Sequence, residues 1–449
     1  MFSTALILGL AWTAFALDSP PGLVTPTACQ RIAAEVSNAT NVYYPGSLSY
    51  KVDNEHFASS SSQISSCSVE PGSVEDVGTI LRILGQTRMP FGVKGGGHAF
   101  NPGFSSTTGV QIAMTRSLEP PRFQCPWRES IRDRCGWLHS WWRNQYGLAI
   151  DNVAAYELVM PNGNVTNVTA SSDPDLFFSL KGGGNNFGVV TRFTLKTFPQ
   201  GNIWGGTTLF PATVLSPFTA AAAKFSSEVT DPKAAMIIAF GYAAQQIFLT
   251  TVMVYDGPVP PRGIFDAFLN MSSFQLDVKE RTFVDLNEST QLVIAPVVRP
   301  RTIYNDIPTS NYSKDTIDSL VEEMKSWGAK FDLDSTKIIT YYLEPFLPTL
   351  FKHAAEGSSA YPGLRERLVL PTQISLGWVL ESEDSVFYDA AREMTQKLGM
   401  AGAPRYPNYA IFGTPVVDMY GEEGLKRMVT TKERVDPDGV MQLTGGFKV

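Results

Sequence analysis

The stretch between positions 91 and 106 holds the residues whose types and spacing best suit chemistry. A short apolar strand at 91–94 leads into three consecutive glycines, and a histidine follows them directly. Because glycine has no side chain, such a turn can curl and bring its N–H groups close to an anion, usually a pyrophosphate. The residues predicted to form this cradle and its rim are Gly95, Gly96, Gly97, His98 and Ala99.

Other motifs and catalytic classes fit this chain less well. No Lys-Ser or Lys-Thr follows the glycines, as in a nucleotide P-loop, and their spacing is not that of a G-x-G-x-x-G turn. A glycine-rich turn with a purely structural histidine is the alternative for His98. A hydrolase is disfavoured, because the chain has only four histidines and contains neither Gly-x-Ser-x-Gly nor His-Glu-x-x-His.

Regular elements flank the glycine turn. Ser73 is predicted to cap a helix whose apolar residues recur with helical spacing, and the next strand spans 110–114. The apolar face of that helix comprises Val77, Ile80, Leu81 and Leu84. The other elements predicted before position 200 are strands at 157–160 and 165–168, a helix at 173–180, and a strand at 189–198 that follows a second glycine cluster at 182–188.

The pattern changes after position 200. From about 203 to 404, strands at 235–242 and 247–255 stand among predicted helices, which indicates an antiparallel sheet with helices packed on it. The helices are predicted at 216–229, 261–271, 314–327 and 385–398. The chain therefore belongs to the α+β class, with this second region as a domain of its own.

Composition and charge restrict the partners. The formal net charge is −7, which argues against nucleic acid, since its binders are generally basic. Residues 1–16 combine a short apolar run with an Ala-x-Ala site and predict a signal peptide. No later apolar run is long enough for a membrane span, so we expect a secreted, soluble protein.

Sequons and cysteines agree with an oxidising compartment. Of the four cysteines, Cys29 and Cys67 are expected to pair, and no Cys/His cluster has zinc spacing, so no metal site is predicted. The Asn-x-Ser/Thr sequons predict glycosylation at Asn38, Asn164, Asn167, Asn270, Asn287 and Asn311.

Taken in order, these motifs resemble a known family. The His98 turn, Asn152, the second glycine cluster and the C-terminal Tyr406-x-Asn-Tyr409 are similar to fungal FAD-linked oxidoreductases. These are vanillyl-alcohol-oxidase-like flavoproteins with a PCMH-type FAD-binding domain and a berberine-bridge-like C-terminus. The resemblance implies an FAD domain at 25–200, a substrate domain at 203–404, and a C-terminal segment at 405–449 that returns to the FAD domain.

The resemblance also implies roles for single residues. His98 holds the position of the histidine that bonds covalently to the flavin, and the glycine loop would hold the FAD pyrophosphate. The residues that match the adenine- and ribose-side contacts are Asn152, Gly184, Asn186, Gly188 and Val190. Tyr406 and Asn408 match the motif near the isoalloxazine. For each of these residues, a turn or a buried structural position is the alternative.

The implied reaction is the oxidation of an alcohol, a sugar or a secondary metabolite. The substrate gives a hydride to FAD and a proton to a base, and O₂ or another acceptor then reoxidises the flavin. The sequence does not select the base. Its candidates are Tyr341, Tyr342, Glu344, Glu381, Tyr406 and Asn408. Neither the substrate nor the oligomeric state is specified.

Residues 123–142 depart from the family. Relatives carry a longer block here that lines the FAD site and often contains a cysteine with a second flavin bond. This chain has instead a Trp- and Arg-rich stretch in which neither Cys125 nor Cys135 matches that motif. One hypothesis is a defective gene model of a functional oxidase. The competing hypotheses are a biological deletion and a non-catalytic secreted glycoprotein that keeps the scaffold without the flavin.

Overall fold

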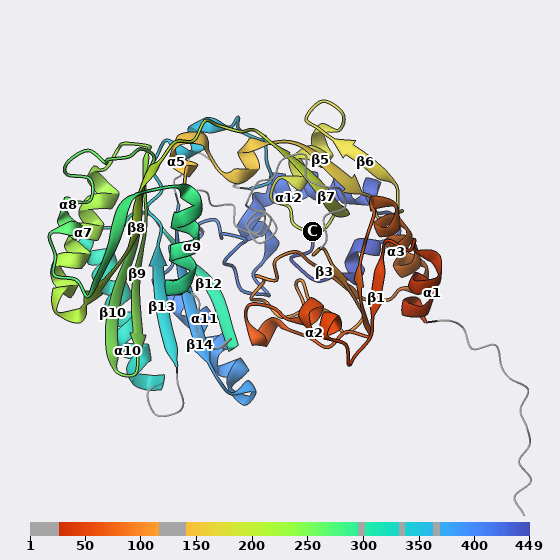
Figure 1. Ribbon diagram of the computed structural model, residues 1–449, viewed down its shortest axis with the longest axis horizontal. Helices are drawn as coiled ribbons and strands as arrows, with labels where there is room; N and C mark the ends of the chain where they lie inside the picture. The colour runs from red at the N-terminus through yellow and green to blue at the C-terminus, as the bar shows by residue number, and fades with distance from the viewer. Residues whose placement is uncertain (1–26, 116–140, 295–300, 332–336, 362–368) are drawn as a thin grey trace, which may run out of the picture.

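Three β-sheets organise the part of the protein that the structure describes (Figure 1). The computed structural model describes residues 27–115, 141–294, 301–331, 337–361 and 369–449. The predicted signal peptide, Cys125, Cys135 and the rest of the unusual stretch up to position 140 lie outside these described residues. In Figure 1 the largest sheet occupies the left half, and the two smaller sheets occupy the right half.

The first sheet carries the glycine turn. Its strand order is β1-β2-β4-β3, with β2, β4 and β3 parallel and β1 antiparallel. The elements are α1 (Ala28–Glu35), β1 (Asn41–Tyr43), α2 (Leu48–Asn54), β2 (Cys67–Glu70), α3 (Val74–Thr87), β3 (Phe91–Lys94) and β4 (Val110–Ala113). The predicted cap is confirmed, because the side chain of Ser73 accepts the N–H of Asp76. The predicted apolar face of α3 is fully buried in this domain's core.

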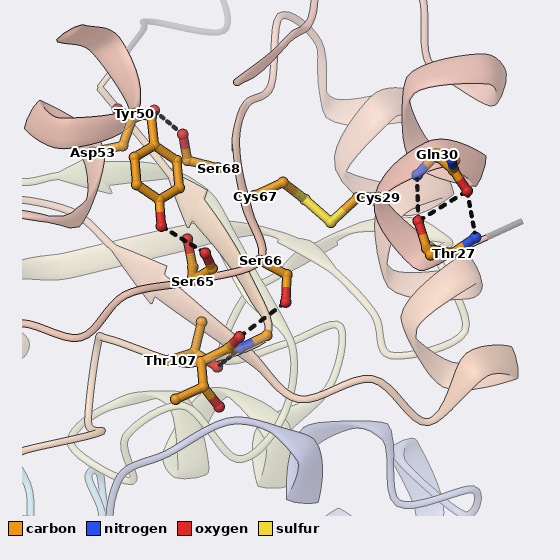
Figure 2. The surroundings of a disulfide bond; sticks show 12 residues. Thr27, Cys29, Gln30, Tyr50, Asp53, Ser65, Ser66, Cys67, Ser68 and Thr107 are labelled. Carbon is orange, nitrogen blue, oxygen red and sulfur yellow. Dashed lines mark hydrogen bonds between the residues drawn. A yellow bond between two sulfur atoms is a disulfide. The ribbon is translucent and has the colours of Figure 1, made fainter. Parts of the chain in front are cut away.

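The predicted disulfide between Cys29 and Cys67 is confirmed. It joins α1 to β2 beside a buried hydrogen bond from the Tyr50 hydroxyl to the Ser65 carbonyl (Figure 2). Burial of both cysteines places the bond inside the hydrophobic core rather than at the surface. The link therefore fixes the amino-terminal helix to the sheet that leads to the glycine turn.

The second sheet is antiparallel, in the order β6-β5-β7. Its strands and associated helices are β5 (Val153–Val159), β6 (Val165–Val168), α6 (Pro174–Leu180), β7 (Val189–Leu195) and α12 (Val416–Val435). After α12 the chain runs back to the first sheet, where Thr444 forms a bridge with Phe91. The Asn185 side chain also donates to the Gly445 carbonyl at 2.7 Å. Segments more than two hundred residues apart thus pack together around the glycine turns.

The third sheet has seven antiparallel strands, in the order β11-β8-β10-β9-β13-β14-β12. Its strands are β8 (Ile203–Pro211), β9 (Ala234–Ala243), β10 (Gln246–Tyr255), β11 (Gln275–Arg281), β12 (Arg301–Thr309), β13 (Ile338–Leu343) and β14 (Leu370–Trp378). Helices α7 (Leu215–Glu228), α10 (Lys314–Phe331) and α11 (Asp384–Leu398) pack with one face in a large apolar core. Helix α9 (Phe283–Ile294) contacts β8 from the opposite face, where Leu286 packs with Val252.

One predicted helix is wrong. At 261–271 only α8 (Asp266–Leu269) is helical. Pro258, Pro260 and Pro261 restrict the backbone before it, and Gly263 has a φ of 93°, which a helix cannot contain. The predicted strands at 235–242 and 247–255 are confirmed as β9 and β10, and they pair along their whole lengths.

Candidate functional site

The turn after β3 is held in place by α2 and by the segment that follows it. The Gly97 carbonyl accepts the N–H of Phe57 at 2.9 Å, and the Lys94 ammonium donates to the Val52 carbonyl at 2.7 Å. Gly97 has a φ of 73°, and a Cβ there would lie 3.0 Å from Lys94 Cε. This position therefore requires glycine. Gly95 and Gly96 are only half-buried, so their backbone remains accessible to a ligand.

His98 begins a continuous series of aromatic contacts. Its half-buried ring stacks on Phe57, with the centroids 5.0 Å apart, and Phe57 meets Phe100 edge to face. Phe100 stacks on Tyr304 of β12 with a centroid distance of 3.4 Å, and Tyr304 contacts Tyr409. The imidazole is thus connected through packed rings to both the large sheet and the C-terminal motif.

His56 anchors the far end of the same loop. Its Nδ1 lies 3.0 Å from the Asn54 carbonyl and must carry the hydrogen of that bond, since a carbonyl only accepts. The Ser105 hydroxyl then donates to Nε2 at 2.9 Å. Burial lowers the pKa of His56 to about 4, and the nearby Lys94 adds to this shift. The neutral imidazole of His56 therefore has a structural role, in which it joins the segment after α2 to the loop that contains Ser105.

We expect this histidine to make stability pH-dependent. The pKa in the folded state, about 4, lies below the ordinary value of 6.5, so its stabilising effect is complete above pH 6.5 and is lost as the pH falls towards 4. By pH 4.5 the loss in unfolding free energy should reach about 2–3 kcal/mol. Urea unfolding of the wild type and His56→Gln at pH 7 and 4.5 measures it. An equal pH-dependent loss in both proteins would contradict the assignment.

The second glycine cluster is tied to the carboxyl-terminal segment. Gly184 is exposed with a φ of 70°, whereas Gly188, at a φ of 140°, is buried against β5. The Asn186 amide donates to the Gly183 and Phe447 carbonyls at 2.8 and 2.9 Å. Val190 packs against the apolar cluster that contains Leu158 of β5. The Asn152 amide donates to the Tyr146 carbonyl at 2.9 Å. The side chains of Asn152 and Asn186 therefore stabilise turns through hydrogen bonds to backbone carbonyls. In the second glycine cluster, the exposed backbone is that of Gly184.

The C-terminal motif is fixed by a buried carboxylate. Asp306 on β12 accepts the Tyr406 N–H at 2.9 Å and the Arg405 guanidinium at 2.6 Å. The Tyr406 hydroxyl accepts the Asn408 amide at 2.9 Å, and burial raises its pKa well above 10. Tyr406 and Asn408 therefore form one hydrogen-bonded unit whose backbone position depends on β12.

A second buried carboxylate lies beside this motif. Glu344, just after β13, accepts a short hydrogen bond from the Tyr409 hydroxyl, and Arg143 Nη2 lies 3.9 Å from its Oε2. All three side chains are almost completely buried. Burial raises the pKa of the Glu344 carboxyl, while the Arg143 charge and the Tyr409 hydroxyl oppose the shift. The arrangement can accept a proton at Glu344 through Tyr409.

The remaining candidate bases occupy different environments. Tyr341 and Tyr342 alternate on β13, so Tyr341 faces the helix-covered core and the half-buried Tyr342 faces away from it. Glu381 is 86% exposed in its side chain, where it pairs with Arg301. An exposed carboxylate lacks the burial that tunes a catalytic base, so Glu381 does not share a site with Glu344. Tyr341 does not share that site either, because it faces the helix-covered core.

The sheet face that carries Tyr342 is polar. The register of β12, β14 and β13 places Tyr304, Ser375 and Thr340 opposite one another, with Gln373 and Tyr342 as the next pair. The side chains of Gln373 and Ser375 hydrogen-bond to Tyr304, and burial raises the pKa of that tyrosine. Because Tyr304 also stacks on Phe100 near His98, this polar face adjoins the glycine turn.

Sequence reasoning missed several of these residues. Tyr409 was only the end of a motif, and Tyr304, Asp306 and Arg143 had no local signal. Their roles arise from contacts between distant segments, such as the 65-residue separation between Tyr409 and Glu344. No strand was predicted at the position of β12. Tyr304 and Asp306 could therefore not be recognised from the sequence as residues of one buried strand.

The end of the unusual stretch is built into the fold. Trp141 and Trp142 pack against the buried cluster that contains Leu286 of α9, and the Trp142 ring lies 4.2 Å from the Phe283 ring, measured between centroids. In the following helix α5 (Arg143–Tyr146), the Asn144 amide donates to the Ala234 carbonyl at 3.0 Å and its Oδ1 accepts the Leu347 N–H. From position 141 onward the chain is therefore embedded beside β9 and Glu344.

Across the ranges given above, no helix has both the length and the apolar character needed to cross a bilayer. In the same ranges, no group of three or more His, Cys, Asp or Glu side chains is placed to hold a metal ion.

Several known proteins similar to this chain are FAD-dependent enzymes. An FAD-dependent monooxygenase of Emericella nidulans is 25% identical over 480 aligned positions, which cover 95% of this chain and 99% of the relative. That alignment is longer than the 449 residues of this chain, so the relative contains stretches that this chain lacks. No protein-family model matches.

Solved structures share the fold. A wild-type berberine-bridge-enzyme-like protein of Physcomitrella patens superposes with a TM-score of 0.72 at 16% identity, covering 92% of this chain and 97% of that one. A carbohydrate oxidase of Microdochium nivale, in complex with a substrate analogue, gives 0.70 at 18% identity, with coverages of 92% and 98%. The PCMH-type, antiparallel-sheet fold expected from the sequence is thereby confirmed.

The residues present suit an FAD. Lys94 closes the turn at Gly97, whereas the backbone of Gly95 and Gly96 is partly accessible to a ligand. The half-buried His98 directly follows these glycines. A narrow backbone turn bordered by an aromatic-stacked imidazole fits a diphosphate followed by a planar ring.

Proposed function

We propose that the chain is an FAD-linked oxidoreductase of the berberine-bridge-like type, which oxidises a hydroxylated small molecule and passes the electrons to O₂ or another acceptor. In this reaction an alcohol carbon loses a hydride, its hydroxyl loses a proton, and a carbonyl results. Bound FAD supplies the hydride acceptor. The observation that carries the proposal is the buried Glu344–Tyr409 pair, joined through Tyr304 and Phe100 to the His98 loop.

We assign the cofactor-binding residues as follows. His98 is the covalent anchor, Gly95–Ala99 hold the diphosphate, and the exposed turn at Gly184 approaches the adenosine side. Asn152, Asn186, Gly188 and Val190 shape that turn and its strand. The support is the accessible backbone at both glycine clusters, which are brought together by the carboxyl-terminal segment.

We assign the proton acceptor to Tyr409 backed by Glu344. When Tyr409 takes the substrate proton, it can pass its own hydroxyl proton to Glu344 Oε1, along the hydrogen bond already present. Burial favours the neutral carboxyl that results. Tyr406 and Asn408 stand beside this pair and orient the substrate and the ring.

The polar sheet face supports a proposal for the substrate class. Phenol, amide and hydroxyl groups from Tyr304, Tyr342, Gln373 and Ser375 are donors and acceptors suited to a molecule with several hydroxyl groups. A sugar or a polyhydroxylated metabolite meets that description, and a carbohydrate oxidase is among the proteins that share the fold. Oxygen-consumption assays on sugars, polyols and aromatic alcohols test the proposal, and uptake with none of them would count against it.

We expect Tyr342→Phe to weaken substrate binding. Removing one uncharged hydrogen bond costs about 1 kcal/mol, so KM should rise about fivefold while kcat changes little. The matched control is Tyr341→Phe, one position away but on the helix-covered face of β13. Equal KM values in both variants would show that the substrate does not lie on the Tyr342 face.

We further propose that the protein is secreted and that residues 1–16 are its signal peptide. The FAD domain at 25–200, the substrate domain at 203–404 and the returning segment at 405–449 follow the division between the sheets. The disulfide supports an oxidising compartment. Glycosylation is proposed at the exposed sequon asparagines Asn38, Asn164, Asn167, Asn270 and Asn311.

A second candidate is a scaffold without catalysis, or a defective gene model. The longer alignment to the Emericella relative favours it, because that relative contains sequence that has no counterpart in this chain. The unusual stretch at 123–142 is where we propose the loss. Sequencing the transcript across these codons decides between the causes: a spliced message that encodes the present residues excludes the gene-model hypothesis.

A further inference from the structure

The loop that carries His98 is bonded directly to the loop that carries Tyr406 and Tyr409. Asn101 lies three positions after His98, and its side chain is 9% exposed. Its amide nitrogen donates to the Ala410 carbonyl at 2.9 Å, and its amide oxygen accepts the Phe412 N–H at 2.9 Å. One side chain therefore satisfies two backbone groups of a segment more than three hundred residues away.

The same C-terminal segment is held on its other side by β12. Asn305 accepts the Ile411 N–H at 3.2 Å, and Asp306 accepts the Tyr406 N–H at 2.9 Å. These two contacts fix residues 406–411 relative to the large sheet only. Asn101 hydrogen-bonds this segment directly to the loop that carries His98.

We propose that Asn101 is a positioning residue that sets the distance between the flavin-anchoring loop and the Tyr409–Glu344 proton acceptor. Hydride and proton leave one substrate carbon and its oxygen together, so their acceptors must be spaced correctly. An error of about 1 Å can cost a hundredfold in rate. The role rests on the proposed function, because it presupposes a flavin on His98.

The test compares Asn101→Ala and Asn101→Asp with a matched control, Ser60→Ala. Ser60 also makes two buried backbone contacts between the amino-terminal region and the large sheet, donating to the Thr302 carbonyl at 2.9 Å and accepting its N–H at 3.0 Å. It does not hold residues 406–412. Asn101→Asp keeps the side-chain volume but removes the donor to Ala410, so a defect shared with Asn101→Ala reflects the hydrogen bond rather than a cavity.

Two readouts are taken on the full chain. Amide hydrogen exchange over 406–412 should accelerate about tenfold in both Asn101 variants and remain unchanged in Ser60→Ala. The kcat of the Asn101 variants should fall about tenfold or more, with KM nearly constant, while Ser60→Ala loses thermal stability without that kcat loss.

The outcomes distinguish the positioning role of Asn101 from the proposed function. If the wild type carries flavin and turns over, and the Asn101 variants keep its kcat within twofold, the positioning role is overturned. Unchanged exchange over 406–412 overturns it as well, with or without flavin. If exchange accelerates but the wild type binds no flavin, the proposed function fails while the structural link through Asn101 stands.

Discussion

Replacing His98 with alanine should remove acid-stable flavin from the protein. In the wild type we expect about one flavin per chain to remain with the acid-precipitated polypeptide, and in His98→Ala we expect none. The reason is that His98 is the side chain at the rim of the glycine turn, where it stacks on Phe57 beside the accessible backbone of Gly95 and Gly96. The measurement is the visible absorption of pellet and supernatant after precipitation.

The control for this experiment is His353→Ala. His353 is exposed, and its Nε2 contacts the Asn144 carbonyl in α5, away from the glycine turn. Its flavin should remain in the pellet. Flavin that stays with His98→Ala would show that another side chain forms the link, while flavin lost from both variants would indicate a folding defect rather than a missing bond.

Replacing Glu344 with glutamine should lower kcat by about a hundredfold or more, the usual effect of removing a proton acceptor. Glutamine keeps the volume and can still accept the Tyr409 hydrogen bond, but it cannot take up the proton. Tyr409→Phe should cause a loss of similar size. If the two residues act as one unit, the double variant should be hardly slower than either single variant.

The matched control is Glu323→Gln. Glu323 is also a buried glutamate, but it accepts the Trp327 indole N–H at 2.9 Å on α10, on the helix side of the large sheet. This variant should keep kcat while losing some stability. A Glu344→Gln enzyme with wild-type kcat, or fully additive losses in the double variant, would exclude the pair as the proton acceptor.

Sequence patterns correctly predicted the elements whose structure depends on neighbouring residues in the chain. The α3 helix followed from its cap and spacing, β9 and β10 from their apolar runs, and the Cys29–Cys67 bond from its position. The helix at 261–271 was wrong because three prolines and Gly263 break an otherwise apolar stretch. There, backbone restriction outweighed hydrophobic periodicity.

The candidate site depended on contacts that no local pattern contains. The glycine turn was visible in the sequence, but Tyr409 gained its role only when folding placed it against Glu344. Tyr341 and Tyr342 were indistinguishable as candidates until the strand register put them on opposite faces of β13. Likewise, Glu381 was separated from the buried carboxylates only by its exposure.

The most direct test of the central claim is the absorption spectrum of the unmodified chain before and after acid precipitation. We predict a flavin spectrum that stays with the precipitated protein, because the glycine turn, its rim histidine and the returning carboxyl-terminal segment are assembled together. A colourless, folded protein would contradict the account and favour the scaffold without catalysis.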